Sequence, residues 1–164
     1  KKEIIRQYGT NPLENKDYGK IVNQKHFDRI RGLINSSKVV HGGCADFSSL
    51  KIEPTLMNHV TFEDAVMQEE IFGPLLPVVS YDSLEEAITK INAMEHPLAL
   101  YIFTSDRKIA KDVISRCQFG GGCINDTIIH LATHEMGFGG FGESGMVLTT
   151  DGKDLRPSHI SKVS

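Results

Sequence analysis

The middle of the chain alternates between short apolar runs and amphipathic helical segments, and this alternation limits the possible folds more than any other feature. Apolar runs occupy 75–79 and 98–103, a further short strand is expected at 123–125, and apolar residues at helical spacing lie between these segments. Strands that alternate with helices over short links favour a parallel sheet. A continuous run such as 98–103 is typical of a strand that is buried on both faces. The sequence therefore predicts an α/β fold, with ligands at the carboxyl ends of the strands, near Phe103 and Asn125.

Capping residues and breakers predict where the helices of this region begin and end. Ser83 and Glu86 form a capping box, which begins a helix. Either Thr104 or Ser105 is expected to begin the next helix, and the glycines at 120–122 are expected to end it.

The upstream part of the chain is more irregular. A short helix is expected to end at Gly9, and a second helix begins at Asn23, a suitable N-cap, and continues to about Ile34. Extended segments are expected at 38–41 and 52–60, with Pro54 making the second one irregular or an edge strand.

Composition argues against several classes of protein. The chain has 164 residues and a formal net charge of −3, so charge gives no reason to expect nucleic acid or an anionic membrane as a partner. No apolar run approaches the roughly 20 residues of a membrane-spanning helix. The three cysteines lack the spacing of a disulfide framework or a zinc ribbon. Reduced thiols in a cytoplasmic protein are therefore expected.

Two adjacent carboxylates, Glu69 and Glu70, lie between apolar segments and are followed by Phe72, Gly73 and Pro74. Burying an unpaired carboxylate is unfavourable, so such a pair usually faces solvent or a ligand. A carboxylate can accept two hydrogen bonds, which suits the neighbouring hydroxyls of a ribose. The residue types alone leave two interpretations open, an exposed acidic turn before a strand or a ligand site.

Residues 69–74 resemble the E-E-I-F-G-P signature of the aldehyde dehydrogenase superfamily. Further segments from Lys2 to Met146 are similar to the same family, and 119–126 resembles its fatty-aldehyde, class 3-like branch most. The resemblance implies that 1–146 is an incomplete aldehyde dehydrogenase catalytic domain, a three-layer domain with a parallel sheet. The remaining residues, 147–164, diverge from the family pattern and are expected to be a poorly ordered tail.

The resemblance also implies roles for three residues. Glu70 would bind the nicotinamide ribose, and Phe72 would contact the nicotinamide end of NAD or NADP, with both acting from the rim of the sheet. Phe138 matches the family residue that lines the aldehyde pocket, although Gly137 replaces the proline that precedes it in the family. The residues that distinguish NAD from NADP lie outside the matching segments.

Other candidate sites in the sequence are weaker. The glycine-rich segment 137–145 lacks the ending of a phosphate-binding P-loop. His130 and His134 lack a third metal ligand, so no metal site is predicted. Cys117 and Cys123 fit buried positions, and nothing near Cys44 is expected to lower its thiol pKa.

Two functions follow from the resemblance. In the first, the chain is part of an NAD(P)-dependent enzyme that oxidises aldehydes to carboxylic acids. Because the family's nucleophilic cysteine and general-base glutamate lie upstream of every matching segment, the resemblance predicts no catalytic residue here and no turnover by the chain alone. In the second, the chain is a truncated, non-catalytic relative that binds a partner. The expected partners are an aldehyde substrate and either identical subunits or the missing half of the enzyme.

Overall fold

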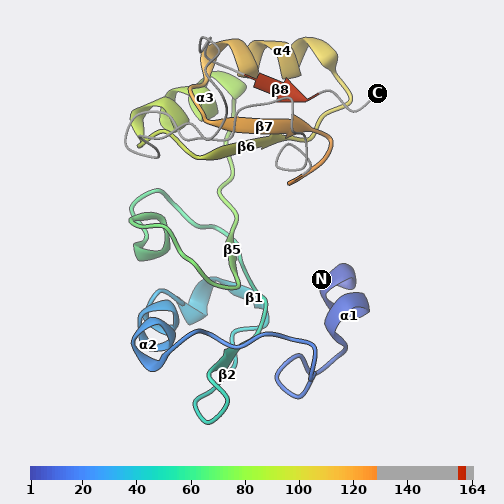
Figure 1. The fold of residues 1–164 in the computed structure, drawn as a ribbon. Helices are drawn as coiled ribbons and strands as arrows, with labels where there is room; N and C mark the ends of the chain where they lie inside the picture. The colour runs from blue at the N-terminus through green and yellow to red at the C-terminus, as the bar shows by residue number, and fades with distance from the viewer. Residues whose placement is uncertain (129–158, 162–164) are drawn as a thin grey trace, which may run out of the picture. The chain divides into compact units, whose positions relative to one another are not determined.

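The structure is a computed structural model that describes residues 1–128 and the backbone of 159–161 (Figure 1). The chain divides into two compact units, Lys1–Ser80 and Tyr81–Ser164, and each is described by itself.

Unit 1 combines two helices with short strands. Its elements are α1 (Lys2–Tyr8), α2 (Gln24–Gly32), η1 (Ser36–Lys38), β1 (Val39–His41), β2 (Ala45–Asp46), β3 (Lys51–Ile52), β4 (Thr55–Met57), η2 (Ala65–Met67) and β5 (Leu75–Pro77). β1, β4 and β5 form one sheet in that order, with β1 antiparallel to β4 and β4 parallel to β5. β2 and β3 form a separate antiparallel pair.

The core of unit 1 forms around α2. The Asn23 side chain accepts a hydrogen bond from the His26 backbone N–H, which confirms the predicted N-cap. One face of the helix carries Phe27 and Ile30, both fully buried. They pack in a cluster with side chains from the strands, from η2 and from the segment between β4 and η2, including Ile52, Met57, Val60, Val66 and Leu75. Burial of these side chains is the main force that holds α2 in place.

Unit 2 contains α3 (Leu84–Ala93), β6 (Ala99–Ile102), α4 (Arg107–Arg116), β7 (Gly121–Ile124) and β8 (His159–Ser161). β6, β7 and β8 form a sheet in that order, and both pairings are parallel. α3 and α4 lie along one face of this sheet (Figure 1), where Ile88 and Val113 share a cluster with Leu100 and Ile102. The Ser83 hydroxyl accepts a hydrogen bond from the Glu86 N–H at the start of α3, as predicted.

The predicted α/β class is confirmed, but the strands pair differently in detail. The runs at 75–79, 98–103 and 123–125 were expected in one sheet, yet β5 pairs with β4 whereas β6 pairs with β7. All three residues of β5 pair with β4 in parallel. β1 is antiparallel to β4, so the sheet of unit 1 is mixed.

Several predicted boundaries are wrong. Asp106 rather than Thr104 or Ser105 caps α4, because its side chain accepts from the Lys108 N–H, while the Thr104 hydroxyl accepts from the Asp106 N–H. α4 ends at Arg116, and Gly121 and Gly122 belong to β7 instead of ending the helix. By contrast, the irregularity expected at Pro54 in the segment 52–60 is confirmed, because Pro54 lies between β3 and β4. Finally, β6 is half-buried rather than buried on both faces.

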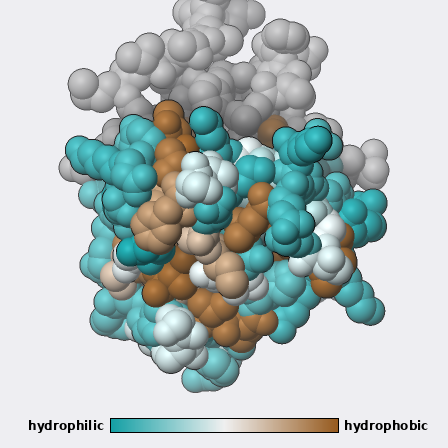
Figure 2. All heavy atoms as spheres, turned by 90° about the horizontal axis from the view of Figure 1, so that it is seen from below, coloured by the Kyte–Doolittle hydropathy of each residue, from teal (hydrophilic) through white to brown (hydrophobic). Residues whose placement is uncertain are grey.

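Some hydrophobic side chains also reach the surface. Figure 2 shows brown areas set among teal on the face that it views. In unit 1 the exposed large hydrophobic residues include Val22, Phe47 and Leu76, and Phe72 is 73% exposed. Scattered exposed apolar residues are normal, so Phe72 is informative only through its place in the acidic motif.

Two further expectations concern the carboxyl-terminal tail and membrane-spanning helices. The predicted boundary between 146 and 147 lies outside the described residues, and the tail is described only as the backbone of β8. No helix within residues 1–128 is long and apolar enough to cross a membrane.

Candidate functional site

The acidic loop, defined here as residues 69–74, connects η2 to β5. The Pro74 carbonyl accepts a hydrogen bond of 2.8 Å from the Thr55 N–H, at the start of β4. Because β4 and β5 are parallel and Thr55 lies opposite Leu75, the loop is at the amino ends of both strands. The carboxyl ends expected to bind ligands, at Phe103 and Asn125, follow β6 and β7 of unit 2 instead.

Both side chains predicted to bind the cofactor project away from the core of unit 1. Glu70 is exposed, and within residues 1–128 its carboxylate has no hydrogen-bond or ion-pair partner. Phe72 has φ 45°, a left-handed backbone conformation that a bulky residue rarely adopts. The residue is 73% exposed, so the strained backbone does not serve to bury the side chain. Strain of this kind concentrates at functional sites.

Arg29 on α2 contacts the acidic loop at several points. Its Nη1 donates to Glu69 Oε1 at 2.8 Å, and its Nη2 donates to the Ile71 carbonyl at 2.5 Å. No motif in the sequence predicts a role for this arginine. Arg29 is separated from these partners by 40 and 42 positions, so no local pattern could have identified it.

Other predicted site residues fall where the structure gives no description. Phe138, the glycine-rich segment 137–145 and both His130 and His134 lie outside the described residues. In the part of the chain that is described, no group of three or more His, Cys, Asp or Glu side chains could hold a metal ion.

The carboxyl end of the β6–β7 pair is closed by Asn125. Its side chain accepts a hydrogen bond from the Thr104 N–H and donates one to the Thr104 carbonyl, both at 2.9 Å. The Asn125 N–H also donates to the Ile102 carbonyl at 2.8 Å. These contacts extend the pairing of the two strands by another step, and they occupy both ends of the Asn125 amide.

The cysteines do not provide an activated thiol in the described part of unit 1 or on α4. The Glu53 carboxylate raises the pKa of the exposed Cys44 thiol, and burial raises the pKa of Cys117. A higher thiol pKa leaves less of the nucleophilic thiolate at neutral pH. Cys117 and Cys123 are both buried, as predicted.

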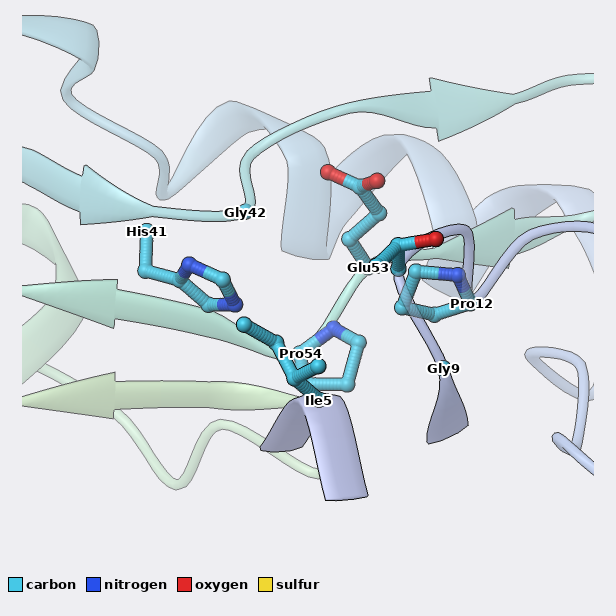
Figure 3. Close-up of a pocket in the computed structure, with 8 residues that line it drawn as sticks. Ile5, Gly9, Pro12, His41, Gly42, Glu53 and Pro54 are labelled. Carbon is cyan, nitrogen blue, oxygen red and sulfur yellow. The ribbon is translucent and has the colours of Figure 1, made fainter. Parts of the chain in front are cut away.

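A pocket of about 260 Å³ lies elsewhere in unit 1 (Figure 3). Its lining includes Ile5, Pro12, His41, Glu53 and Pro54, and none of the residues of the acidic loop. The Glu53 carboxylate is already engaged, because it accepts a hydrogen bond from the Cys44 N–H. The pocket is therefore separate from the predicted cofactor residues.

Comparison with known proteins identifies the family. Residues 5–156 match the aldehyde dehydrogenase family. The chain belongs to this family. It is 50% identical over 88% of its length to 4,4'-diaponeurosporen-aldehyde dehydrogenase of Staphylococcus aureus, and 44% identical over 89% to aldehyde dehydrogenase family 3 member H1 of Arabidopsis thaliana. These relatives confirm the class 3-type resemblance.

The aldehyde dehydrogenase match covers only part of each relative. The chain spans 32% of the Staphylococcus aureus protein and 31% of the Arabidopsis protein. A solved structure, the substrate-bound state of Staphylococcus aureus AldH, matches with a TM-score of 0.86 and 48% identity, over 90% of this chain and 32% of that one. The fold described here is thus a partial aldehyde dehydrogenase domain.

Proposed function

We propose that this chain contributes the nicotinamide-ribose contact and part of the substrate wall to an NAD(P)-dependent enzyme that oxidises aldehydes to carboxylic acids. The observation that carries the proposal is the acidic loop. There the Glu70 carboxylate, which has no partner within residues 1–128, and the exposed Phe72 lie two positions apart, and Phe72 has a strained backbone. Family membership supports the reaction class.

The residues of the loop fit one end of a dinucleotide. Glu70 offers two acceptor oxygens to the two hydroxyls of a ribose, and within residues 1–128 no side chain or backbone group occupies them. Phe72 offers the flat face of its ring to a planar group, and 73% of the residue is open to contact.

Each residue has a limited part in the reaction. Bound NAD(P)⁺ would supply the hydride acceptor. Glu70 orients the ribose by accepting its hydroxyl protons in hydrogen bonds, and Phe72 limits where the ring beside that ribose can lie. Phe138 lines the aldehyde pocket. Positioning of this kind accelerates a reaction without the residue taking part in bond making. The nucleophile and the general base come from the segments that lie upstream in the family.

The test uses a chimera in which residues 1–146 replace the matching third of the Staphylococcus aureus relative. Aldehyde-dependent reduction of NAD(P)⁺ is measured for the chimera and for Glu70→Gln. Loss of a charged acceptor should raise the KM for NAD(P)⁺ about tenfold or more, because a charge-assisted hydrogen bond is lost. The KM for the aldehyde should change less.

Glu14→Gln is the matched control, since it removes an exposed carboxylate from a turn of unit 1 far along the chain from the loop. An unchanged KM for NAD(P)⁺ in Glu70→Gln would contradict the proposed role. The 164-residue chain alone is expected to show no turnover, and aldehyde oxidation by the purified chain would contradict that part of the proposal.

A further inference from the structure

The acidic loop adopts a conformation that its own residues do not favour. Phe72 has φ 45° and an exposed ring, so neither backbone preference nor burial of the side chain stabilises this geometry. A strained conformation persists only where surrounding contacts determine it. Those contacts come from α2.

Arg29 reaches three successive residues of the loop. Nη1 donates to Glu69 Oε1 at 2.8 Å and, at a longer 3.4 Å, to the Glu70 carbonyl, while Nη2 donates to the Ile71 carbonyl at 2.5 Å. The guanidinium is planar and carries its donors in a rigid fork, so these contacts restrict the direction of the chain as well as its position. The Arg29 side chain is only 25% exposed, which limits competition from water.

Ile30, the next residue of α2, contacts the loop at Gly73, near its carboxyl end. An ideal Cβ placed on Gly73 would lie 2.7 Å from Ile30 Cδ1, closer than atoms normally approach. The Gly73 backbone therefore packs directly against Ile30, which is fully buried. Two consecutive helical residues, Arg29 and Ile30, thus contact the loop on either side of Phe72.

This arrangement gives the two adjacent glutamates different tasks. The Glu69 carboxylate is paired with Arg29, whereas the Glu70 carboxylate has no partner within residues 1–128. We infer that Arg29 is a positioning residue, which holds the loop backbone so that Glu70 and Phe72 face the nicotinamide ribose. This inference rests on the proposed function, because it assigns Arg29 to the same site.

A plain surface ion pair would be the alternative, and such pairs contribute little. The contacts favour the positioning role, because two of the three acceptors are backbone carbonyls. Removing the Glu69 charge leaves those two contacts in place. Arg29→Ala should therefore have a larger effect than Glu69→Gln, whereas a simple ion pair predicts equal effects.

The first measurement is made on the 164-residue chain by NMR. Arg29→Ala is expected to shift and broaden the amide signals of residues 69–73, while signals of the core residues Phe27 and Met57 stay in place. Arg29→Lys keeps the charge but not the fork, so it should pair with Glu69 and restore the loop signals only in part. If Arg29→Ala fails to fold, the loop signals of Arg29→Lys provide the test instead.

Arg31→Ala is the matched control on the same helix. The Arg31 guanidinium lies over the Phe47 ring, 4.4 Å from its centre, and no side-chain hydrogen bond or ion pair joins it to the loop within residues 1–128. This variant should leave the signals of residues 69–73 unchanged. Loop signals that are unchanged in both Arg29→Ala and Arg29→Lys would overturn the inference.

The second measurement links the loop to the cofactor. In the chimera described above, Arg29→Ala should raise the KM for NAD(P)⁺ about tenfold, with a smaller change in the KM for the aldehyde, and Arg31→Ala should change neither. If Glu70→Gln raises this KM and Arg29→Ala does not, the inference fails while the proposed function stands. If neither variant changes the KM although Arg29→Ala alters the loop signals, the proposed function fails and Arg29 is a structural contact only.

Discussion

The acidic loop and the end of the β6–β7 pair are both irregular segments beside parallel strands, yet they are held in different ways. Arg29 holds the loop from a helix 40 to 42 positions away, and the side chains of Glu70 and Phe72 are left exposed. At the strand end, Asn125 itself forms the contacts, through both ends of its amide.

The difference bears on the proposed ligand site. A segment that is held by a side chain from elsewhere can present its own polar groups to a partner. A segment whose side chain already bonds the neighbouring strand has fewer groups to offer, because one donor and one acceptor position of the Asn125 amide are used. This favours Glu70 over Asn125 as a ligand-binding residue. The sequence predicted ligands near both residues.

The largest expected effect is on stability, and it should differ between an alanine at Gly122 in β7 and an alanine at Gly73 in the loop. An ideal Cβ on Gly122 would lie 2.2 Å from the Leu100 carbonyl oxygen, which is backbone in β6, whereas a Cβ on Gly73 would meet the end of the Ile30 side chain. Gly122→Ala should therefore lower the free energy of unfolding by about 3 kcal/mol or more, and Gly73→Ala by about 1–2 kcal/mol. Urea unfolding followed by circular dichroism measures both.

A rescue and a control make this comparison sharper. Ile30→Val removes Cδ1, the atom nearest to the added methyl group, so it should reduce the effect of Gly73→Ala. Gly19→Ala is the control, because nothing lies within 4 Å of its added Cβ. Equal losses in Gly73→Ala and Gly122→Ala, with no rescue by Ile30→Val, would show that the loop is held as rigidly as the strand.

The next effect tests whether Asn125 is structural. Asn125→Ala removes two hydrogen bonds and leaves alanine at φ 56°, so we expect a loss of about 2–3 kcal/mol in the free energy of unfolding. Asn125→Gly removes the same bonds without the backbone strain, and should lose about 1 kcal/mol less. Glu70→Gln, measured in the same way, should change stability by less than about 0.5 kcal/mol. A loss in Glu70→Gln equal to that in Asn125→Ala would remove the distinction between the two regions.

The same contrast explains what could be predicted from the sequence. Asn23 and Ser83 were predicted as caps because a cap depends on residues three positions apart, and the contiguous motif drew attention to Glu70 and Phe72. Arg29 could not be found, since its contact with the loop depends on how the core packs α2. Thr104, Ser105 and Asp106 all favour an N-cap, so the sequence could not choose among them.

Strand boundaries at glycine were the other difficulty. Gly121 and Gly122 disfavour a strand by local preference, and the sequence therefore indicated a break. In the structure Gly122 is needed in β7, because the Leu100 carbonyl approaches too closely for any side chain. This requirement arises between strands and leaves no trace in the local pattern.

The smallest expected effect concerns pH. The approach to the acidic loop is anchored by Asp64, whose carboxylate accepts hydrogen bonds from Lys38 Nζ at 2.5 Å and from the Thr61 N–H at 2.7 Å. The hydrogen bond from Lys38 lowers the pKa of Asp64. Since the folded pKa lies below the unfolded value of about 3.9, the stabilisation is present above pH 4 or so and is lost as the pH falls through the folded value.

Asp64→Asn should therefore be less stable than the unmodified chain at pH 7, by less than Asn125→Ala is, and this deficit should shrink at pH 3. Other carboxyls, including Glu3 and Asp46, also have lowered pKa values, so only the difference between the two proteins isolates Asp64. The deficit of Asn125→Ala should be the same at both pH values, because amide contacts do not titrate. A deficit in Asp64→Asn that is unchanged from pH 7 to pH 3 would mean that the approach to the loop, like the strand end, is held by contacts that carry no charge.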